Sequence, residues 1–239
     1  MTRFSYKNIA GLGAALSLLE ISIPEENPII NSLAVSIRKS ERWREKLEEE
    51  NPDDESGFYA DLSFEEECLT DDLIGVAFVV CQQGITSVVS NYCFLRKQWL
   101  EHQKTIHNRE PKEDFLKISI SSESCKEALM AKENPLLGKC SKIATINAFA
   151  NYYKHRDEWP NDWDKKLPGK SLRTAEVILD AGAALDSPCS NCGKGYQKLT
   201  GEISSVRLDR LWKIIFDWSR EIREKCRKDL VRCRCCPGK

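Results

Sequence analysis

One stretch of this chain, Ser63 to Lys104, has the character of a single long helix, and it constrains the fold more than any other feature. Ser63 and Glu66 have the spacing of a capping box, which predicts a helix start at Ser63. The segment Ile74 to Val80 is rich in β-branched residues, but no turn residues flank it, so helix is favoured over strand. At about 1.5 Å per residue the helix would span roughly 60 Å, a length at which we expect a kink near Gly84.

Shorter helices are predicted on both sides of it. Asn27 to Glu50 places Pro28 in a first helical turn and repeats apolar residues at near-helical spacing. In Ser204 to Leu230, apolar residues recur at three- and four-residue steps, which predicts a strongly amphipathic last helix. The other expected elements are helices at 8–19, 122–133, 137–158 and 171–184, an extended piece at 116–120 and a turn at 187–195.

The predicted fold class is therefore all-α: a helical bundle around one long central helix, with a small cysteine-containing appendage at the C-terminus. Residues 1–186 would form the bundle. Residues 187–239 would add a cysteine-knuckle loop, an amphipathic helix and a cysteine-rich tail packed on it. The same elements would also fit one domain overall, because a chain of 239 residues is long enough for either arrangement.

Composition and charge set limits on function. With 41% hydrophobic and 31% charged residues, the chain is typical of a globular protein. Its formal net charge of -1 argues against a strong attraction of the whole surface to nucleic acid or membrane. Local charge is uneven, since residues 41–72 hold 14 acidic and 3 basic side chains, whereas residues 207–239 hold 11 basic and 5 acidic ones.

The most apolar stretch, Ile74 to Leu95, favours a buried core helix over a membrane span. It is interrupted by Gln82, Gln83, Ser87, Ser90 and Asn91, and each of these would need a partner inside a bilayer. Near the N-terminus, Arg3 and Lys7 precede an apolar run, but Glu20 follows closely and no small-residue cleavage pattern is present. We therefore expect a cytoplasmic protein without membrane association.

The chain has 11 cysteines, an odd number that a complete disulfide framework cannot use. Five of them stand singly in helix-like or loop stretches, where a reduced thiol packs as a small hydrophobic group. These five favour a reducing compartment. They are Cys68, Cys81, Cys93, Cys125 and Cys140.

A second group of cysteines predicts a structural zinc site. Cys189 and Cys192, followed by Gly193, have the form of a zinc knuckle, in which two thiolates bind one ion and the glycine permits a tight turn. Cys233 and Cys236, near Cys235 in the tail, would complete a tetrahedral site if the last helix folded back. A redox pair, a disulfide formed on handling and unliganded thiols are the alternatives.

The densest polar cluster runs from Asn151 to Trp159. On a helix, Asn151 and His155 project from the same face, because they are four residues apart. Together with Tyr152, Lys154 and Arg156, they bring an amide, an imidazole, a phenol and cations together, a composition suited to binding an anion or to acid–base chemistry. The alternative is a capped helix end whose basic residues interact favourably with the helix dipole.

The string Ala150 to His155 resembles the Arg-Asn-x-x-x-His signature of HEPN proteins, a helical-bundle family that is often dimeric and includes metal-independent ribonucleases of toxin and antiphage systems. The resemblance implies RNA binding or cleavage and a homodimer. It gives catalytic roles to His155 and Asn151, with Arg156 supplying the charge that Ala150 lacks. In such a protein, Lys154 and Tyr152 would contact the nucleic acid. Trp159 could stack on a base, although packing in the core is the role expected for it by default. Because Ala150 replaces the family's arginine, a degenerate, non-catalytic member is also implied.

The second functional hypothesis is a non-catalytic, zinc-stabilised interaction protein. In this interpretation the polar cluster is structural, and the basic C-terminal helix docks on an acidic partner. The residues contain no Gly-rich phosphate loop, no Gly-x-Ser-x-Gly and no His-Glu-x-x-His motif, which makes several large enzyme classes improbable.

Overall fold

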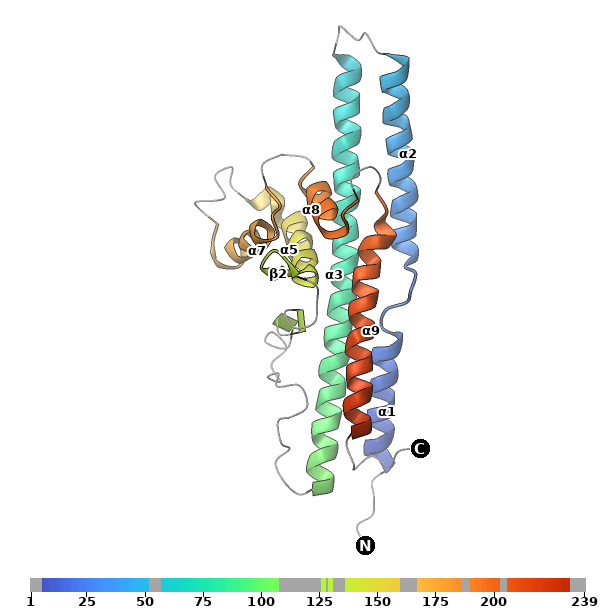
Figure 1. Cartoon of the computed structure of the whole chain (residues 1–239), viewed down its shortest axis with the longest axis vertical. Coiled ribbons are helices and arrows are strands. Elements are labelled where there is room, and N and C mark those ends of the chain that lie inside the picture. The colour runs from blue at the N-terminus through green and yellow to red at the C-terminus, as the bar shows by residue number, and fades with distance from the viewer. Residues whose placement is uncertain are drawn as a thin grey trace. The chain divides into compact units, whose positions relative to one another are not determined.

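The computed structural model shows an all-α fold with a long central helix, which confirms the predicted class (Figure 1). The structure describes residues 6–51, 57–107, 126–127, 129–130, 136–159, 167–185, 190–202 and 206–232. Its elements, in chain order, are α1 (Tyr6–Ile21), α2 (Pro28–Glu50), α3 (Phe58–His107), β1 (Leu136–Leu137), β2 (Cys140–Ser141), α5 (Lys142–His155), the 3-10 turn η1 (Arg156–Glu158), α7 (Gly169–Asp180), α8 (Asn191–Thr200) and α9 (Leu208–Arg232).

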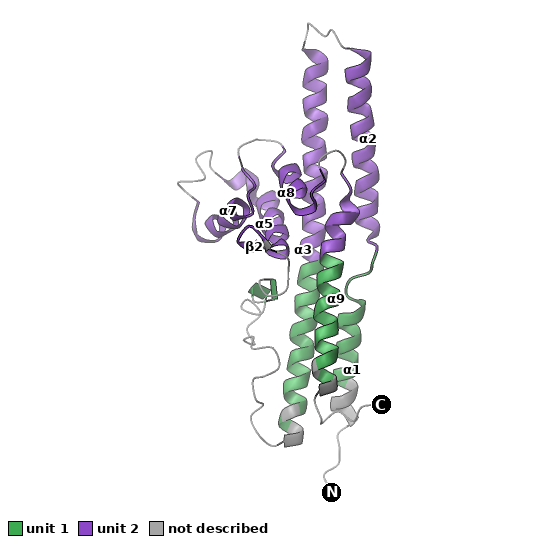
Figure 2. Ribbon diagram, viewed as in Figure 1, with its two compact units in different colours: residues 1–25, 84–133, 215–239 green, residues 26–83, 134–214 purple. Residues whose placement is uncertain are grey.

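The chain divides into two compact units (Figure 2). Unit 1 contains residues 1–25, 84–133 and 215–239, and unit 2 contains residues 26–83 and 134–214. Both α3 and α9 contribute to both units. The units do not follow the predicted boundary at residue 186, because residues 134–214 all belong to unit 2.

Helix α3 begins earlier than the capping box predicted. It starts at Phe58, after Gly57, which adopts the left-handed conformation (φ +74°) and whose carbonyl accepts the N–H of Asp61. Ser63 lies inside the helix, and its hydroxyl donates to Oε1 of Glu48 at 3.3 Å. The predicted cap at Ser63 was therefore wrong, because the helix already starts at Phe58, directly after the left-handed Gly57. The helix is continuous through Gly84.

Helix α2 confirms its prediction closely. Oδ1 of Asn27 accepts the backbone N–H groups of Ile29 (2.9 Å) and Ile30 (3.2 Å), and Pro28 occupies the first turn, where no N–H is needed. The helix lies beside α3 (Figure 1), and its Ser40 hydroxyl donates to the carboxylate of Glu66 on α3. Its buried apolar residues are Ile30, Ala34, Ile37 and Leu47.

Helix α5 is shorter than predicted at both ends. A two-residue antiparallel pairing of β1 and β2 precedes it, with Gly138 in the turn at φ +62°. The hydroxyl of Ser141 then accepts the N–H of Ala144 at 3.0 Å and caps the helix, which therefore starts at Lys142. The helix ends at His155, and the 3-10 turn η1 continues the chain to Glu158.

Helix α8 was not predicted, since residues 187–195 were expected to form a turn. The helix begins at Asn191, and Gly195 lets it pack directly against the ring of Phe149 on α5. Helix α7 is confirmed but ends at Asp180, because Gly182 at φ +75° turns the chain. The strongly amphipathic α9 is confirmed with a start at Leu208.

Two shorter predictions fall largely on residues outside those described. The extended piece at 116–120 lies wholly outside them. Of the predicted helix at 122–133, the four described residues are helical.

In unit 1, α1 and the unit's parts of α3 and α9 lie side by side (Figures 1 and 2). Asn91 of α3 donates to the carbonyl oxygen of Leu18 at 3.2 Å. From α9, Nη1 of Arg223 donates to the carbonyl oxygen of Glu20 at 2.8 Å, and Arg227 forms a 2.6 Å ion pair with the Glu20 carboxylate. Two basic residues of α9 thus hold the end of α1.

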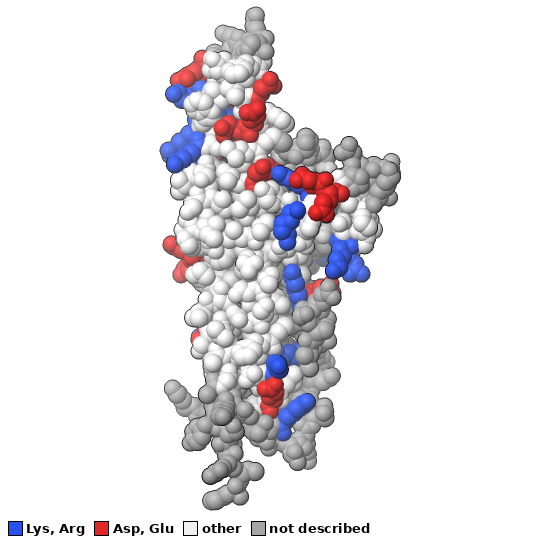
Figure 3. Space-filling model, turned by 180° about the vertical axis from the view of Figure 1, so that it is seen from behind, with Lys and Arg blue, Asp and Glu red and all other residues white. Residues whose placement is uncertain are grey.

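A stretch of α3 between Phe58 and His102 is long and apolar enough, by length and composition alone, to cross a membrane. Of its most apolar window, 56% is buried inside the molecule, as in a core helix. Residues 73–95 contain no Asp, Glu, Lys or Arg. Figure 3 shows a broad area with few charged side chains on the face seen from behind.

Candidate functional site in unit 2

The side chain of Gln82 on α3 forms hydrogen bonds with three residues of α5. Its Nε2 donates to Oδ1 of Asn147 at 2.9 Å and to Oδ1 of Asn151 at 2.8 Å. Its Oε1 accepts a hydrogen bond from Nζ of Lys154 at 2.8 Å. These three α5 residues share one helical face, since they are spaced by four and three positions. A single amide therefore fixes the face that carries the predicted site.

Asn151 and His155 are held by different neighbours. The Asn151 amide oxygen is bound by Gln82, whereas Nδ1 of His155 lies 3.1 Å from Oε1 of Glu158 in η1. The His155 side chain is 53% exposed, so the imidazole is accessible to solvent. Although the two residues share a helical face, the ring nitrogen is placed by a carboxylate of the following turn and not by Asn151.

Arg156 fastens the end of α5 to α3. Its Nη2 lies 2.7 Å from Oδ1 of Asp72, and its guanidinium carbon lies 4.7 Å from the centroid of the Tyr153 ring. The side chain is half-buried. The guanidinium of Arg156, which was expected to contact a phosphodiester, is thus held by an ion pair and a cation–π contact within the protein.

Tyr152 and Trp159 serve packing in this structure. Tyr152 is buried, and its hydroxyl accepts a hydrogen bond from Nδ2 of Asn191 on α8 at 2.8 Å. Burial raises the pKa of Tyr152. The ring of Trp159 meets that of Tyr152 edge to face, at a centroid distance of 5.3 Å. These contacts join α5, α8 and η1, and the face of Tyr152 is not presented as a stacking platform.

Asp71 of α3 caps helix α8. Its Oδ1 accepts the backbone N–H of Gly193 at 2.7 Å, so a carboxylate from another helix satisfies a donor that helix starts leave open. Asp71 is buried, and burial raises its pKa, although the bond from Gly193 acts in the opposite direction. The sequence did not indicate this role, because the two partners are more than a hundred residues apart.

Cys192 is the one predicted zinc ligand within the described residues. It is buried, and burial raises the pKa of its thiol well above the ordinary value, with the neighbouring Asp71 adding to the effect. Within the described part of the chain, no group of three or more His, Cys, Asp or Glu could hold a metal ion. The other predicted ligands, Cys189, Cys233 and Cys236, lie outside it, so the zinc site stays a prediction.

Cys68 is disulfide-bonded, and its expected state as a single reduced thiol was wrong. Five further cysteines that the structure describes are not disulfide-bonded: Cys81, Cys93, Cys140, Cys192 and Cys226. Helical spacing identified a position that packs as a small residue, but it carries no information on a partner distant in sequence.

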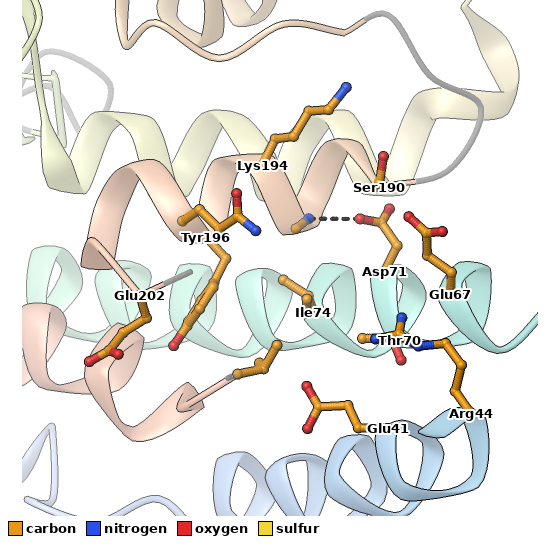
Figure 4. A pocket seen from close by; sticks show the side chains of 13 residues that line it. Glu41, Arg44, Glu67, Thr70, Asp71, Ile74, Ser190, Lys194, Tyr196 and Glu202 are labelled. Carbon is orange, nitrogen blue, oxygen red and sulfur yellow. Dashed lines mark hydrogen bonds between the residues drawn. The ribbon is translucent and has the colours of Figure 1, made fainter. Parts of the chain in front are cut away.

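A cavity of about 330 Å³ lies in unit 2 between α2, α3, α8 and the segment that leads to α9 (Figure 4). Its floor includes Ile74 of α3. In Figure 4, Arg44 reaches toward Thr70, and the amine of Lys194 extends away from α3. The cavity is within the size range of small-ligand sites, although it is more polar than most. Its acidic lining residues are Glu41, Glu67, Asp71 and Glu202.

The lining of this cavity carries an excess of negative charge. Four carboxylates and two basic residues, Arg44 and Lys194, line it. Glu202 pairs with Arg210 at 3.6 Å and Arg44 pairs with Glu48 at 3.8 Å, so the excess charge belongs to Glu41, Glu67 and Asp71. Burial raises the pKa of Glu41, as it does that of Asp71, which means that both carboxylates lack full compensation. Glu67 forms no ion pair with any residue that the structure describes. The arrangement is therefore suited to a cationic group with hydrogen-bond donors, such as an amine or a guanidinium.

No family model, curated protein or solved structure matches this chain. The resemblance of Ala150 to His155 to the HEPN signature stays a prediction.

Proposed function

We propose that this chain is a non-catalytic helical interaction protein. The observation that carries the proposal is the ion pair of Arg156 with Asp72 at 2.7 Å. A nuclease site needs cationic groups directed at a phosphodiester, and here the only arginine of the cluster is bound to an acid. Glu158 lies beside His155 in the same way. Acids on both sides of the cluster disfavour a phosphate.

The cavity is the proposed place of recognition. A Lys or Arg side chain of a partner protein would enter between Glu67 and Asp71, with Glu41 on the opposite wall. The exposed face of α9 is a weaker candidate for docking, because Arg220 pairs with Asp217 and Arg227 pairs with Glu224 on the same helix. The zinc site, the homodimer and the docking of α9 on an acidic partner remain predictions.

We expect Nα-acetyl-lysine amide, whose side-chain ammonium is free, to bind the full chain with a Kd in the millimolar range. Glu67→Gln should weaken this binding about threefold. The substitution removes one charge from the cavity without breaking an ion pair of the described residues. Chemical-shift titration by NMR measures the affinity. Because the pKa values of Glu41 and Asp71 are raised, binding should weaken as the pH falls through those raised values.

Glu65→Gln is the matched control, since Glu65 is exposed on the same helix and does not line the cavity. It should bind the amine as the wild type does. N-acetyl-glutamine amide tests the need for charge. Equal binding of the neutral and charged probes, or equal loss in both variants, would contradict recognition of a cation in this cavity.

A second candidate function, RNA cleavage, is supported by one observation: the imidazole of His155 at the end of α5 is exposed. Under our proposal, wild type and His155→Ala both leave a fluorescent single-stranded RNA intact over hours at neutral pH. If the chain is instead a ribonuclease, the wild type should cleave the RNA, and His155→Ala should lower the cleavage rate at least a hundredfold. Lys170→Ala serves as a control for a contaminating nuclease, because Lys170 is on α7, away from the cluster in sequence. Cleavage abolished only by His155→Ala would reverse the assignment.

A further inference from the structure

Unit 1 contains a buried arginine that has no hydrogen-bond or ion-pair partner among the described residues. Arg96 lies on α3 and is 9% exposed. Its Nε and Nη1 atoms are buried and have no hydrogen-bond partner. Arg156, by comparison, pairs with Asp72, and Arg223, whose Nε is also buried without a partner, still donates from Nη1 to the carbonyl oxygen of Glu20.

The surroundings of Arg96 do not neutralise it. Tyr92 and Trp99 lie one helical turn to either side of it on the same face, and both are buried. Among the described residues, no carboxylate lies within ion-pair distance of Arg96. A buried lysine can release its proton, but a guanidinium stays charged in a protein. An uncompensated buried charge is strongly unfavourable, so an anion that bound Arg96 would stabilise unit 1.

We infer that unit 1 binds a phosphate group at Arg96. A phosphate supplies the negative charge and several acceptors, and guanidinium–phosphate pairs are among the strong charge-assisted hydrogen bonds. A neutral ligand would satisfy the donors without compensating the charge. This site is separate from the cavity of unit 2, and the inference does not depend on the proposed function.

The test is thermal unfolding of the full chain in inorganic phosphate or in chloride at equal ionic strength. Ligand that binds only the folded state raises the Tm, so phosphate at about ten times its Kd should add roughly 3 to 5 °C to the wild type. Arg96→Met removes the charge at similar volume, and its Tm should not respond to phosphate. Lys97→Met removes an exposed cation from the adjacent position and should respond as the wild type does.

If phosphate raises the Tm of the wild type, Arg96→Met and Lys97→Met equally, the effect is general salt stabilisation, and the inference is overturned. An unresponsive wild type together with a more stable Arg96→Met would also overturn it, since Arg96 would then be only an unpaired charge. If Arg96→Met does not fold, Arg96→Lys replaces it. That variant keeps the charge without the planar fork, and its apparent phosphate affinity should fall at least fivefold.

Adenosine monophosphate, tested beside inorganic phosphate, distinguishes the two sources of the group. A larger Tm shift with the nucleotide at equal concentration indicates a nucleotide, and an equal shift indicates free phosphate. Either result supports the site, provided that the shift is lost in Arg96→Met.

Discussion

Alanine at Gly195 is expected to lower the free energy of unfolding by about 3 kcal/mol. A Cβ at this position would lie 2.6 Å from Cε1 of Phe149 and would overlap two further atoms of the same ring. The ring has no room to move, because Phe149 is fully buried and stacked on Phe78 at a centroid distance of 5.1 Å. Urea denaturation followed by circular dichroism measures the change.

Gly13→Ala is the matched control, since a Cβ at Gly13 in helix α1 meets nothing within 4 Å. That substitution should stabilise the chain slightly, by up to about 1 kcal/mol, because alanine favours helix. If both glycine variants shift stability in the same direction, the close packing of α8 on α5 is not as described.

The second large effect is expected at Asp71, where alanine and asparagine should behave differently. Asp71→Ala removes the acceptor of the Gly193 N–H and should cost about 2 kcal/mol, the usual penalty for a buried donor left without a partner. Asp71→Asn keeps an acceptor oxygen and removes a buried charge, so its stability at neutral pH should stay within about 1 kcal/mol of the wild type. Equal losses in the two variants would show that the charge itself is required.

The pH dependence of stability provides an independent test of the same residue. The pKa of Asp71 is raised in the folded state by burial, so the folded state binds the proton more tightly than the unfolded chain. Its contribution therefore disfavours the folded state above the raised pKa, and this effect is relieved as the pH falls toward the usual value of about 3.9. Asp71→Asn should lack this component when unfolding is measured across that pH range. An unchanged profile would contradict the raised pKa.

Capping residues and apolar spacing predicted those helices whose ends are determined by residues close by in the sequence. The start of α2 followed from Asn27 and Pro28, and the apolar spacing of α9 predicted a helix over nearly its whole length. The start of α3 was missed because Gly57 turns the chain before the apparent cap at Ser63. Helix α8 was missed because glycines in its sequence suggested a turn, although Gly195 serves close packing against α5.

The candidate site was predictable only in part. Periodicity placed Asn151 and His155 on one helix, but it could not show which partners each would bind. Gln82 was noted only as a polar interruption of an apolar stretch, whereas it binds three residues of α5. The role of Asp71 depends on Gly193, and no local pattern connects residues so distant in sequence. The cavity consists of four separate segments and has no signature in any one of them.

The interleaved make-up of the two units affects how deletion experiments can be interpreted. Residues 208–214 of α9 belong to unit 2 and residues 215–232 to unit 1, so removal of this helix takes buried side chains from both cores. Loss of binding after such a truncation would report damaged folding as readily as a lost contact. Single substitutions at exposed positions are therefore the sounder way to map a binding surface on this chain.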